Sequence, residues 1–97
     1  GMMRPQHVLE RFHVNQNSAG ARDWLALTYR YAAGEQISVI VQDLARKANR
    51  PSAAIYARMK RALAPVLNAN VLQLRAVGID LPERTTTALA RACAKLC

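Results

Sequence analysis

The chain has 97 residues, 52% of them hydrophobic, which suffices for one compact domain and is too little for two domains with separate cores. The formal net charge of +8 excludes no fold, but it makes a polyanion or another anionic surface the expected partner. Only four glycines and four prolines occur, while Ala, Leu and Arg are plentiful, so the composition favours helices over a β-sandwich or disorder. We therefore expect one all-α domain, a compact bundle of four to five helices.

Several classes of function are disfavoured by what the sequence contains. No apolar run approaches the roughly 20 residues that span a bilayer, and no signal-peptide core is seen, so we expect a cytoplasmic protein without a membrane partner. Cys93 and Cys97 are too close for a structural disulfide, and His7 and His13 lack further ligands at metal spacing, so no cofactor is expected. The six carboxylates form no acid–base pair and no glycine-rich phosphate loop occurs, which argues against an enzyme and a small-molecule substrate.

Residues 1–17 are open to two interpretations, a short helix or an N-terminal arm. In "HVLERFHV", Val8, Leu9 and Phe12 have helical spacing, while alternate residues also fit a strand; we interpret the segment as a short helix. The turn-forming residues of "NQNSAG" then predict a loop and a helix that begins near Ser18.

The next two helices are marked by apolar stripes. In "SAGARDWLALTYRYAAGE", three- and four-residue steps predict a helix with Trp24 and Tyr31 in the core and Gly34 as a left-handed C-terminal cap. Ser38 then fits the N-cap of a helix whose outward side carries Gln42, Asp43, Arg46 and Lys47. Its inward stripe consists of Ile37, Ile40, Val41, Leu44, Ala45 and Ala48.

The segment "NRPS" separates this helix from another. Asn49 tolerates a left-handed conformation, and Pro51 suits the first turn of a helix over about residues 51–64. Beyond Pro65, "VLNANVLQLRAVG" and "IDLPERTTTALARACAKLC" each predict one more helix. We expect residues 18–64 to form a three-helix unit, and the two C-terminal helices in 65–97 either to pack on it or to pair with a second copy.

Residues 41–63 have the elements of a helix-turn-helix, two helices joined by a turn of three or four residues. Ala45 is small where the helices must approach, and Ile55 is placed to fill the angle between them. The stretch "LARKANRPSAAIYARMKRAL" resembles the "LA..LGRS..AV..R...L" signature of small bacterial three-helix DNA-binding domains, including the sigma-region-four-like and Myb-like groups. With Trp24, Tyr31 and Gly34 the resemblance extends over about residues 24–63. Asn49 and Ala48 depart from it, standing where a glycine and a larger apolar residue are usual.

A helical wheel divides the helix over 51–64 into a buried side and a face for DNA. Ile55, Met59 and Ala62 lie on the buried side. Ala53 and Ala57 let the opposite face enter a major groove, and polar neighbours reach base edges or phosphates. The predicted groove contacts are Ser52, Ala53, Tyr56, Ala57, Lys60 and Arg61. Basic residues around the turn suit backbone contacts that fix register without reading sequence, namely Arg46, Lys47 and Arg50. Arg58 lies at the edge of the buried side of the helix, and its head group binds a DNA phosphate or a carboxylate such as Asp43.

These observations predict a small transcriptional regulator that binds double-stranded DNA, with a homodimer as a hypothesis because two recognition helices must lie one DNA turn apart. Three other interpretations remain open. The basic residues of 44–63 form a face that is only solvated, or they dock onto an acidic protein partner such as a secretion or phage component, or they bind structured RNA. The sequence lacks the aromatic-rich sheet signature of proteins that bind single-stranded RNA, so we rank RNA binding below the other interpretations.

Overall fold

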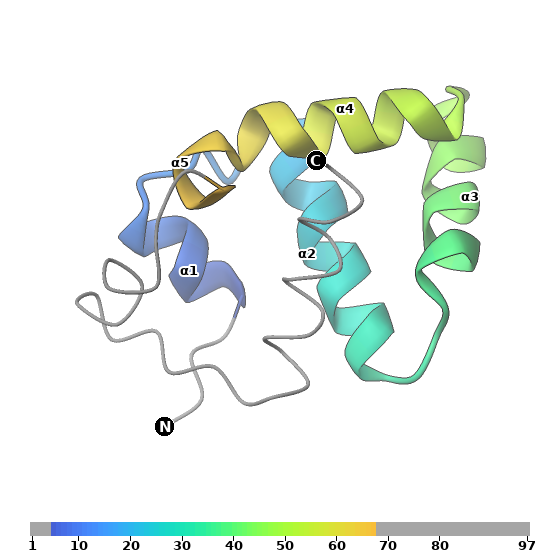
Figure 1. Cartoon of the computed structure of the whole chain (residues 1–97), viewed down its shortest axis with the longest axis horizontal. Coiled ribbons are helices and arrows are strands. Elements are labelled where there is room, and N and C mark those ends of the chain that lie inside the picture. The colour runs from blue at the N-terminus through green and yellow to red at the C-terminus, as the bar shows by residue number, and fades with distance from the viewer. Residues whose placement is uncertain (1–4, 68–97) are drawn as a thin grey trace.

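The structure is a computed structural model that describes residues 5–67, and this part of the chain is all-α. Five helices follow one another: α1 (Pro5–Arg11), α2 (Ala19–Ala32), α3 (Ile37–Ala48), α4 (Ser52–Ala62) and α5 (Ala64–Leu67). In Figure 1, α4 lies across one end of α2, with α1 and α3 on opposite sides of α2. The compact all-α bundle expected from composition is thereby confirmed.

The segment that offered two periodicities is helical. Val8 and Leu9 of α1 are both buried, and Val14 after it also joins the core. The chain then turns through Asn15–Ser18, where the Ser18 hydroxyl donates to the Asn15 carbonyl at 2.8 Å. Residues 5–11 therefore pack on the domain as the short helix that the spacing of Val8 and Leu9 indicates.

Both ends of α2 are capped as the sequence predicts. The Ser18 hydroxyl accepts a hydrogen bond from the Ala21 backbone N–H at 3.2 Å, which satisfies one free donor of the first turn. At the other end Gly34 has φ +106°, and its N–H donates to the Tyr31 carbonyl while the Glu35 N–H donates to the Arg30 carbonyl. This is a Schellman motif, which requires a left-handed residue at the position of Gly34.

The turn between α3 and α4 also follows its local chemistry. Asn49 is left-handed, with φ 53° and ψ 47°, and its N–H donates to the Arg46 carbonyl. Pro51, which we expect in the first turn of the helix, is instead the N-cap of α4, and its carbonyl accepts from the N–H groups of Ala54 and Ile55. The predicted N-cap Ser38 is wrong: the N-cap is Gln36, two residues earlier, and it makes no side-chain hydrogen bond. Ser38 therefore lies within the first turn of α3, which begins at Ile37.

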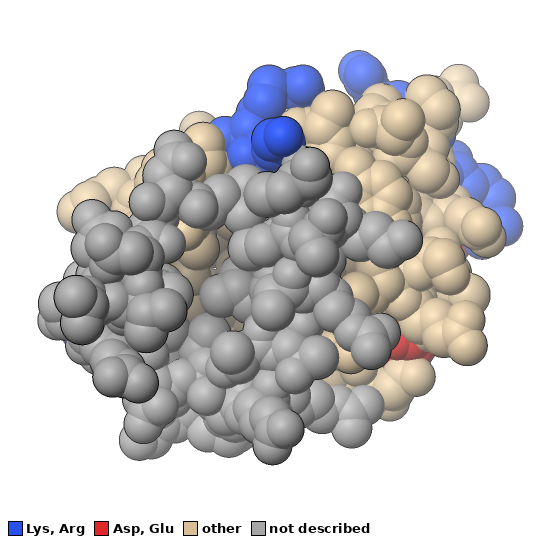
Figure 2. All heavy atoms as spheres, in the orientation of Figure 1, with Lys and Arg blue, Asp and Glu red and all other residues tan. Residues whose placement is uncertain are grey.

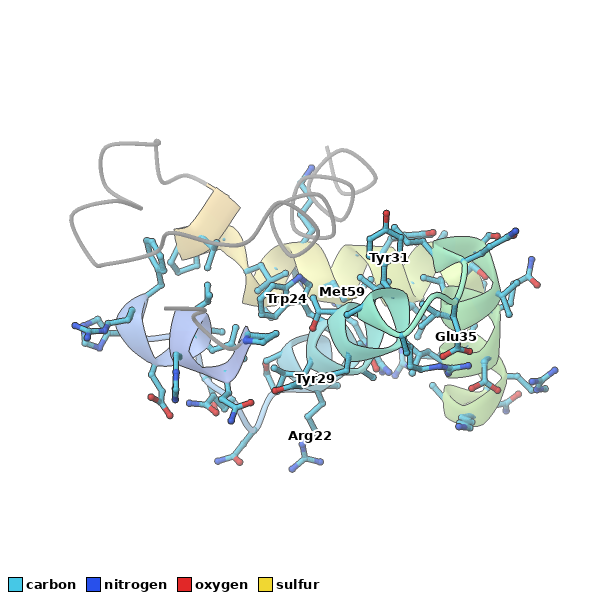
Figure 3. All side chains as sticks on the ribbon, turned by 90° about the horizontal axis from the view of Figure 1, so that it is seen from below. Arg22, Trp24, Tyr29, Tyr31, Glu35 and Met59 are labelled. Atoms are coloured by element: carbon cyan, nitrogen blue, oxygen red, sulfur yellow. The ribbon has the colours of Figure 1, made fainter. Side chains whose placement is uncertain are left out.

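The core lies where α2 meets α4 and α3. Trp24 and Met59 are 2% and 1% exposed and lie between α2 and α4, as Figure 3 shows. The α3 stripe contributes Ile37, Ile40, Val41 and Ala45 as buried residues, with Leu44 and Ala48 packed at its margin. Burial of a large apolar side chain contributes roughly 1.5–3 kcal/mol, so this shared core is the main source of stability for the three helices.

Some predictions fall beyond the part of the chain that the structure describes. They include residues 68–97, with most of the two helices predicted for 65–97 and with Cys93 and Cys97. The described residues end with α5, which has Pro65 in its first turn. Among the helices in 5–67, none has the length and apolar character that a bilayer crossing requires.

Candidate nucleic-acid interface

The helix-turn-helix predicted for 41–63 corresponds to α3, a short turn and α4. Ala45 is 6% exposed and Ile55 is 0% exposed, and both belong to the shared core, as the helix-turn-helix prediction requires. A larger side chain at Ala45 would separate α3 from α4, whereas Ile55 fills the space that the turn leaves. The interior therefore fixes the direction in which the outer face of α4 points.

The outer face of α4 combines small and basic side chains. Ala53, Ala57, Lys60 and Arg61 are all exposed, and α4 contains no acidic residue. Figure 2 shows Lys and Arg atoms gathered over α4 and beside α3. With Arg50 just before the helix, these five residues form what we call the α4 face: Arg50, Ala53, Ala57, Lys60 and Arg61.

Ser52 and Tyr56, the other two predicted groove contacts, are only half-buried and lie at the margin of this face. Tyr56 packs partly against the core, and burial raises the pKa of its hydroxyl. A ring held in this way has less freedom to reach a base than an exposed one. Its hydroxyl stays protonated at neutral pH and is available as a hydrogen-bond donor.

Two of the predicted backbone contacts, Arg46 and Lys47, are exposed but already have a protein partner. Their side chains are 78% and 71% exposed, and both form ion pairs with Asp43, at 2.8 Å and 3.1 Å. Arg30 of α2 binds the same carboxylate at 2.6 Å and also holds Glu35 at 2.7 Å. Asp43 therefore faces the end of α2, not solvent alone, and it offsets part of the positive field beside the turn.

The ion pairs among Arg30, Glu35, Asp43, Arg46 and Lys47, which we call the Asp43 cluster, also shift the pKa values of three of its members. Hydrogen bonds from Arg30, Arg46 and Lys47 hold the pKa of Asp43 well below its usual range. The Arg30 side chain likewise lowers the pKa of Glu35, and both carboxylates raise the pKa of Arg30. All three groups are charged at neutral pH, and the cluster ties the end of α2 to α3.

Arg58 has a structural partner that differs from the one suggested by sequence. Its Nε donates to Asp23 Oδ2 at 2.5 Å, and the two side chains are only 20% and 10% exposed. The suggested partner Asp43 is thus wrong, because Asp23 of α2 lies opposite Arg58 where α2 crosses α4. A guanidinium held by a buried carboxylate is primarily part of the α2–α4 packing.

Sequence reasoning missed a cavity beside the α4 face. It has a volume of about 430 Å³ and lies between the start of α2 and α4, with Arg50, Arg58 and Arg61 among its lining residues. Gly20 of α2 also lines it, and a Cβ there would lie 2.1 Å from the Arg58 carbonyl oxygen. The spacing of Arg50 and Arg61, eleven residues or about three helical turns, is the signal that places both on one side of α4.

Comparison with known proteins adds no assignment: no family model matches the chain, and neither a curated protein nor a solved structure matches it.

Proposed function

We propose that the chain binds double-stranded DNA through α3 and α4, as a small transcriptional regulator, with α4 as the recognition helix. The observation that supports this most strongly is the α4 face, where Ala53 and Ala57 leave the helix backbone uncovered between basic side chains. A helix with its side chains is about 10–12 Å across, and the major groove of B-DNA is about 12 Å wide. Small residues on the leading face let the helix approach the base edges.

The basic residues would supply most of the binding free energy. Arg50, Lys60 and Arg61 are exposed on or beside α4, and Arg46 and Lys47 are exposed at the end of α3. If about five phosphates are neutralised, the logarithm of the binding constant should fall with the logarithm of salt concentration at a slope of about −4 to −5. Because α4 contains no Asn or Gln, discrimination between base pairs should be modest.

The first test is fluorescence anisotropy with a labelled random-sequence duplex of about 30 base pairs, near three DNA turns, at two salt concentrations. The variant K60A/R61A should bind about tenfold or more weakly than the wild type. R11A/R22A is the matched control, since it removes the same charge from exposed positions of α1 and α2. A folded wild-type protein that does not bind at low salt would contradict the proposal.

Ala57→Glu separates DNA from an acidic protein partner. Ala57 is exposed, so the substitution leaves the fold intact. Against DNA the new carboxylate faces phosphates and loses its water, and binding should be abolished. An adaptor whose acidic partner leaves Ala57 in solvent would retain most of its affinity.

A further inference from the structure

The cavity beside α4 is lined by three arginines, and no carboxylate occurs among its lining residues in 5–67. Arg50, Arg58 and Arg61 line it, together with Ser18, Ala19 and Gly20 at the start of α2. Its volume of about 430 Å³ far exceeds that of a water molecule, about 30 Å³, so a hydrated anion fits. Positive groups that converge on one hollow repel one another, and an anion seated between them removes that repulsion.

The three arginines differ in how far the protein already satisfies them. Arg58 is already paired with Asp23, whose Oδ2 lies 2.5 Å from the Arg58 Nε. Arg50 and Arg61 are exposed and form no ion pair with any residue of this range. Three arginines therefore line one hollow, two of them without an ion pair in residues 5–67, and Arg is well suited to phosphate because its donors bind two oxygens at once.

The start of α2 adds backbone donors to the same hollow. The N–H groups of Ala19 and Gly20 have no hydrogen-bond partner in the described part of the chain, whereas that of Ala21 is bound by the Ser18 hydroxyl. Free N–H groups in the first turn carry partial positive charge and favour an anion. They supplement the arginines, which supply the formal charge.

The position of the cavity connects it to the proposed recognition helix. Arg61 belongs to the α4 face and also lines the cavity, so the cavity borders this face on the side of α2. When a helix lies in a major groove, the sugar–phosphate backbones run along its two flanks. A duplex seated on the α4 face would bring one backbone to Arg61 and Arg50.

We propose that this cavity is a phosphate site that takes one backbone phosphate of the bound duplex, held by Arg50, Arg61 and the start of α2. The inference rests on the proposed function. It also reassigns Arg61, which we predicted from sequence as a groove contact: in this arrangement Arg61 supplies affinity and register, not base discrimination.

The test uses two pairs of variants in the anisotropy assay. Arg61→Ala should make the salt slope less negative by about 0.9 and weaken binding equally on AT-rich and GC-rich duplexes. Arg22→Ala is its control, because Arg22 is an exposed arginine of α2 that points away from α4 (Figure 3).

The second pair removes a backbone donor without changing charge. Ala19 is the first residue of α2, where proline is tolerated, and Ser18 has φ −68° and ψ 147°, the extended conformation that suits a residue before proline. Ala19→Pro should bind DNA about tenfold more weakly than Ala19→Ser, which keeps the N–H, with equal thermal stability.

The outcomes separate the site from the function. If the wild type binds duplex while Ala19→Pro matches Ala19→Ser and Arg61→Ala keeps the wild-type slope, the phosphate site is overturned and DNA binding stands. A second experiment measures the Tm of Ala19→Pro and Ala19→Ser with inorganic phosphate in place of chloride, at constant ionic strength. If the wild type does not bind duplex, but phosphate raises the Tm of Ala19→Ser and not of Ala19→Pro, the ligand is free phosphate and the assignment to DNA is overturned.

Discussion

Gly20 of α2 lies directly against the backbone of Arg58 in α4: a Cβ atom on Gly20 would stand 2.1 Å from the Arg58 carbonyl oxygen and 2.9 Å from Ala62 Cβ. Neither atom is the end of a flexible side chain, so relief would require the helices to move apart. These two helices form the most extensively packed pair in residues 5–67. The missing side chain of Gly20 therefore sets how closely α2 crosses α4.

The first prediction concerns Gly20→Ala. Within a helix this change ordinarily stabilises by about 1 kcal/mol, because alanine has the higher helix propensity. Here the methyl group enters the contact with Arg58, so we expect the free energy of unfolding to fall by about 1–3 kcal/mol, as overpacking does. Urea denaturation followed by circular dichroism measures the change.

Gly34→Ala is the control for this substitution. A Cβ on Gly34 would meet no atom within 4 Å, so only its φ of +106° opposes a side chain. That strain should cost about 1–2 kcal/mol. Stabilisation of the protein by Gly20→Ala would contradict the close crossing of α2 and α4.

The second prediction concerns the Asp23–Arg58 ion pair. Removal of Arg58 leaves the Asp23 carboxylate, 10% exposed, without its partner, so Arg58→Ala should destabilise by about 2–4 kcal/mol. Arg46→Ala is the comparison at a side chain that is 78% exposed, and it should change stability by less than about 1 kcal/mol.

A double-mutant cycle separates pairing from the loss of packing. Asp23→Ala combined with Arg58→Ala leaves no unpaired charge, so the double variant should be more stable than the sum of the single losses implies. Additive losses would show that the ion pair itself contributes nothing.

The helices that pack through regular apolar stripes were predictable from sequence. The stripe of α3 from Ile37 to Ala48, the Ser18 cap of α2 and the left-handed Asn49 each depend on local spacing and local hydrogen bonds. Such features require no knowledge of a distant residue. The prediction of Ser38 as N-cap was wrong because α3 begins at Ile37, whose side chain is buried in the core. Burial of Ile37 outweighs the preference of serine for the N-cap position.

The features of the candidate interface that were not predictable all join residues far apart in sequence. Asp23 meets Arg58 across 35 residues, and Arg30 meets Asp43 across 13. Helical periodicity places each residue on a face but does not show which charges oppose one another after two helices cross. The cavity beside α4 has the same origin, because the start of α2 reaches α4 only through the crossing at Gly20.

The third prediction is the response of stability to acid. Arg30 and its neighbours lower the folded-state pKa of Asp43 and Glu35, so the unfolded chain binds more protons near the ordinary carboxyl pKa of about 4. Stability from this cluster is therefore complete above about pH 5 and is lost as pH falls through the lowered folded-state values.

The matched variant for this effect is Asp43→Asn. It should have a lower Tm than the wild type at pH 7, because Arg30 loses one of its two carboxylates. As the pH falls below about 5, the Tm of this variant should fall less than that of the wild type, since the variant lacks the Asp43 carboxylate, whose pKa differs between the folded and unfolded states. Thermal melts at several pH values below about 5 give the dependence of Tm on pH for both proteins. If the two Tm curves are parallel, the ion pairs of Asp43 do not contribute to the acid sensitivity of the protein.

The fourth prediction uses the same variant against DNA and rests on the proposed function. Asp43 holds Arg46 and Lys47 at 2.8 Å and 3.1 Å, so its negative charge competes with phosphate for both cations. Asp43→Asn should bind a duplex a few-fold more tightly at low salt, while the salt slope stays at about −4 to −5, because Arg46 and Lys47 no longer exchange an ion pair with Asp43 when they bind phosphate. Glu10→Gln makes the same charge change at an exposed position of α1 and should leave both quantities near the wild-type values. Equal gains from the two variants would show that net charge alone acts, and would remove Arg46 and Lys47 from the interface.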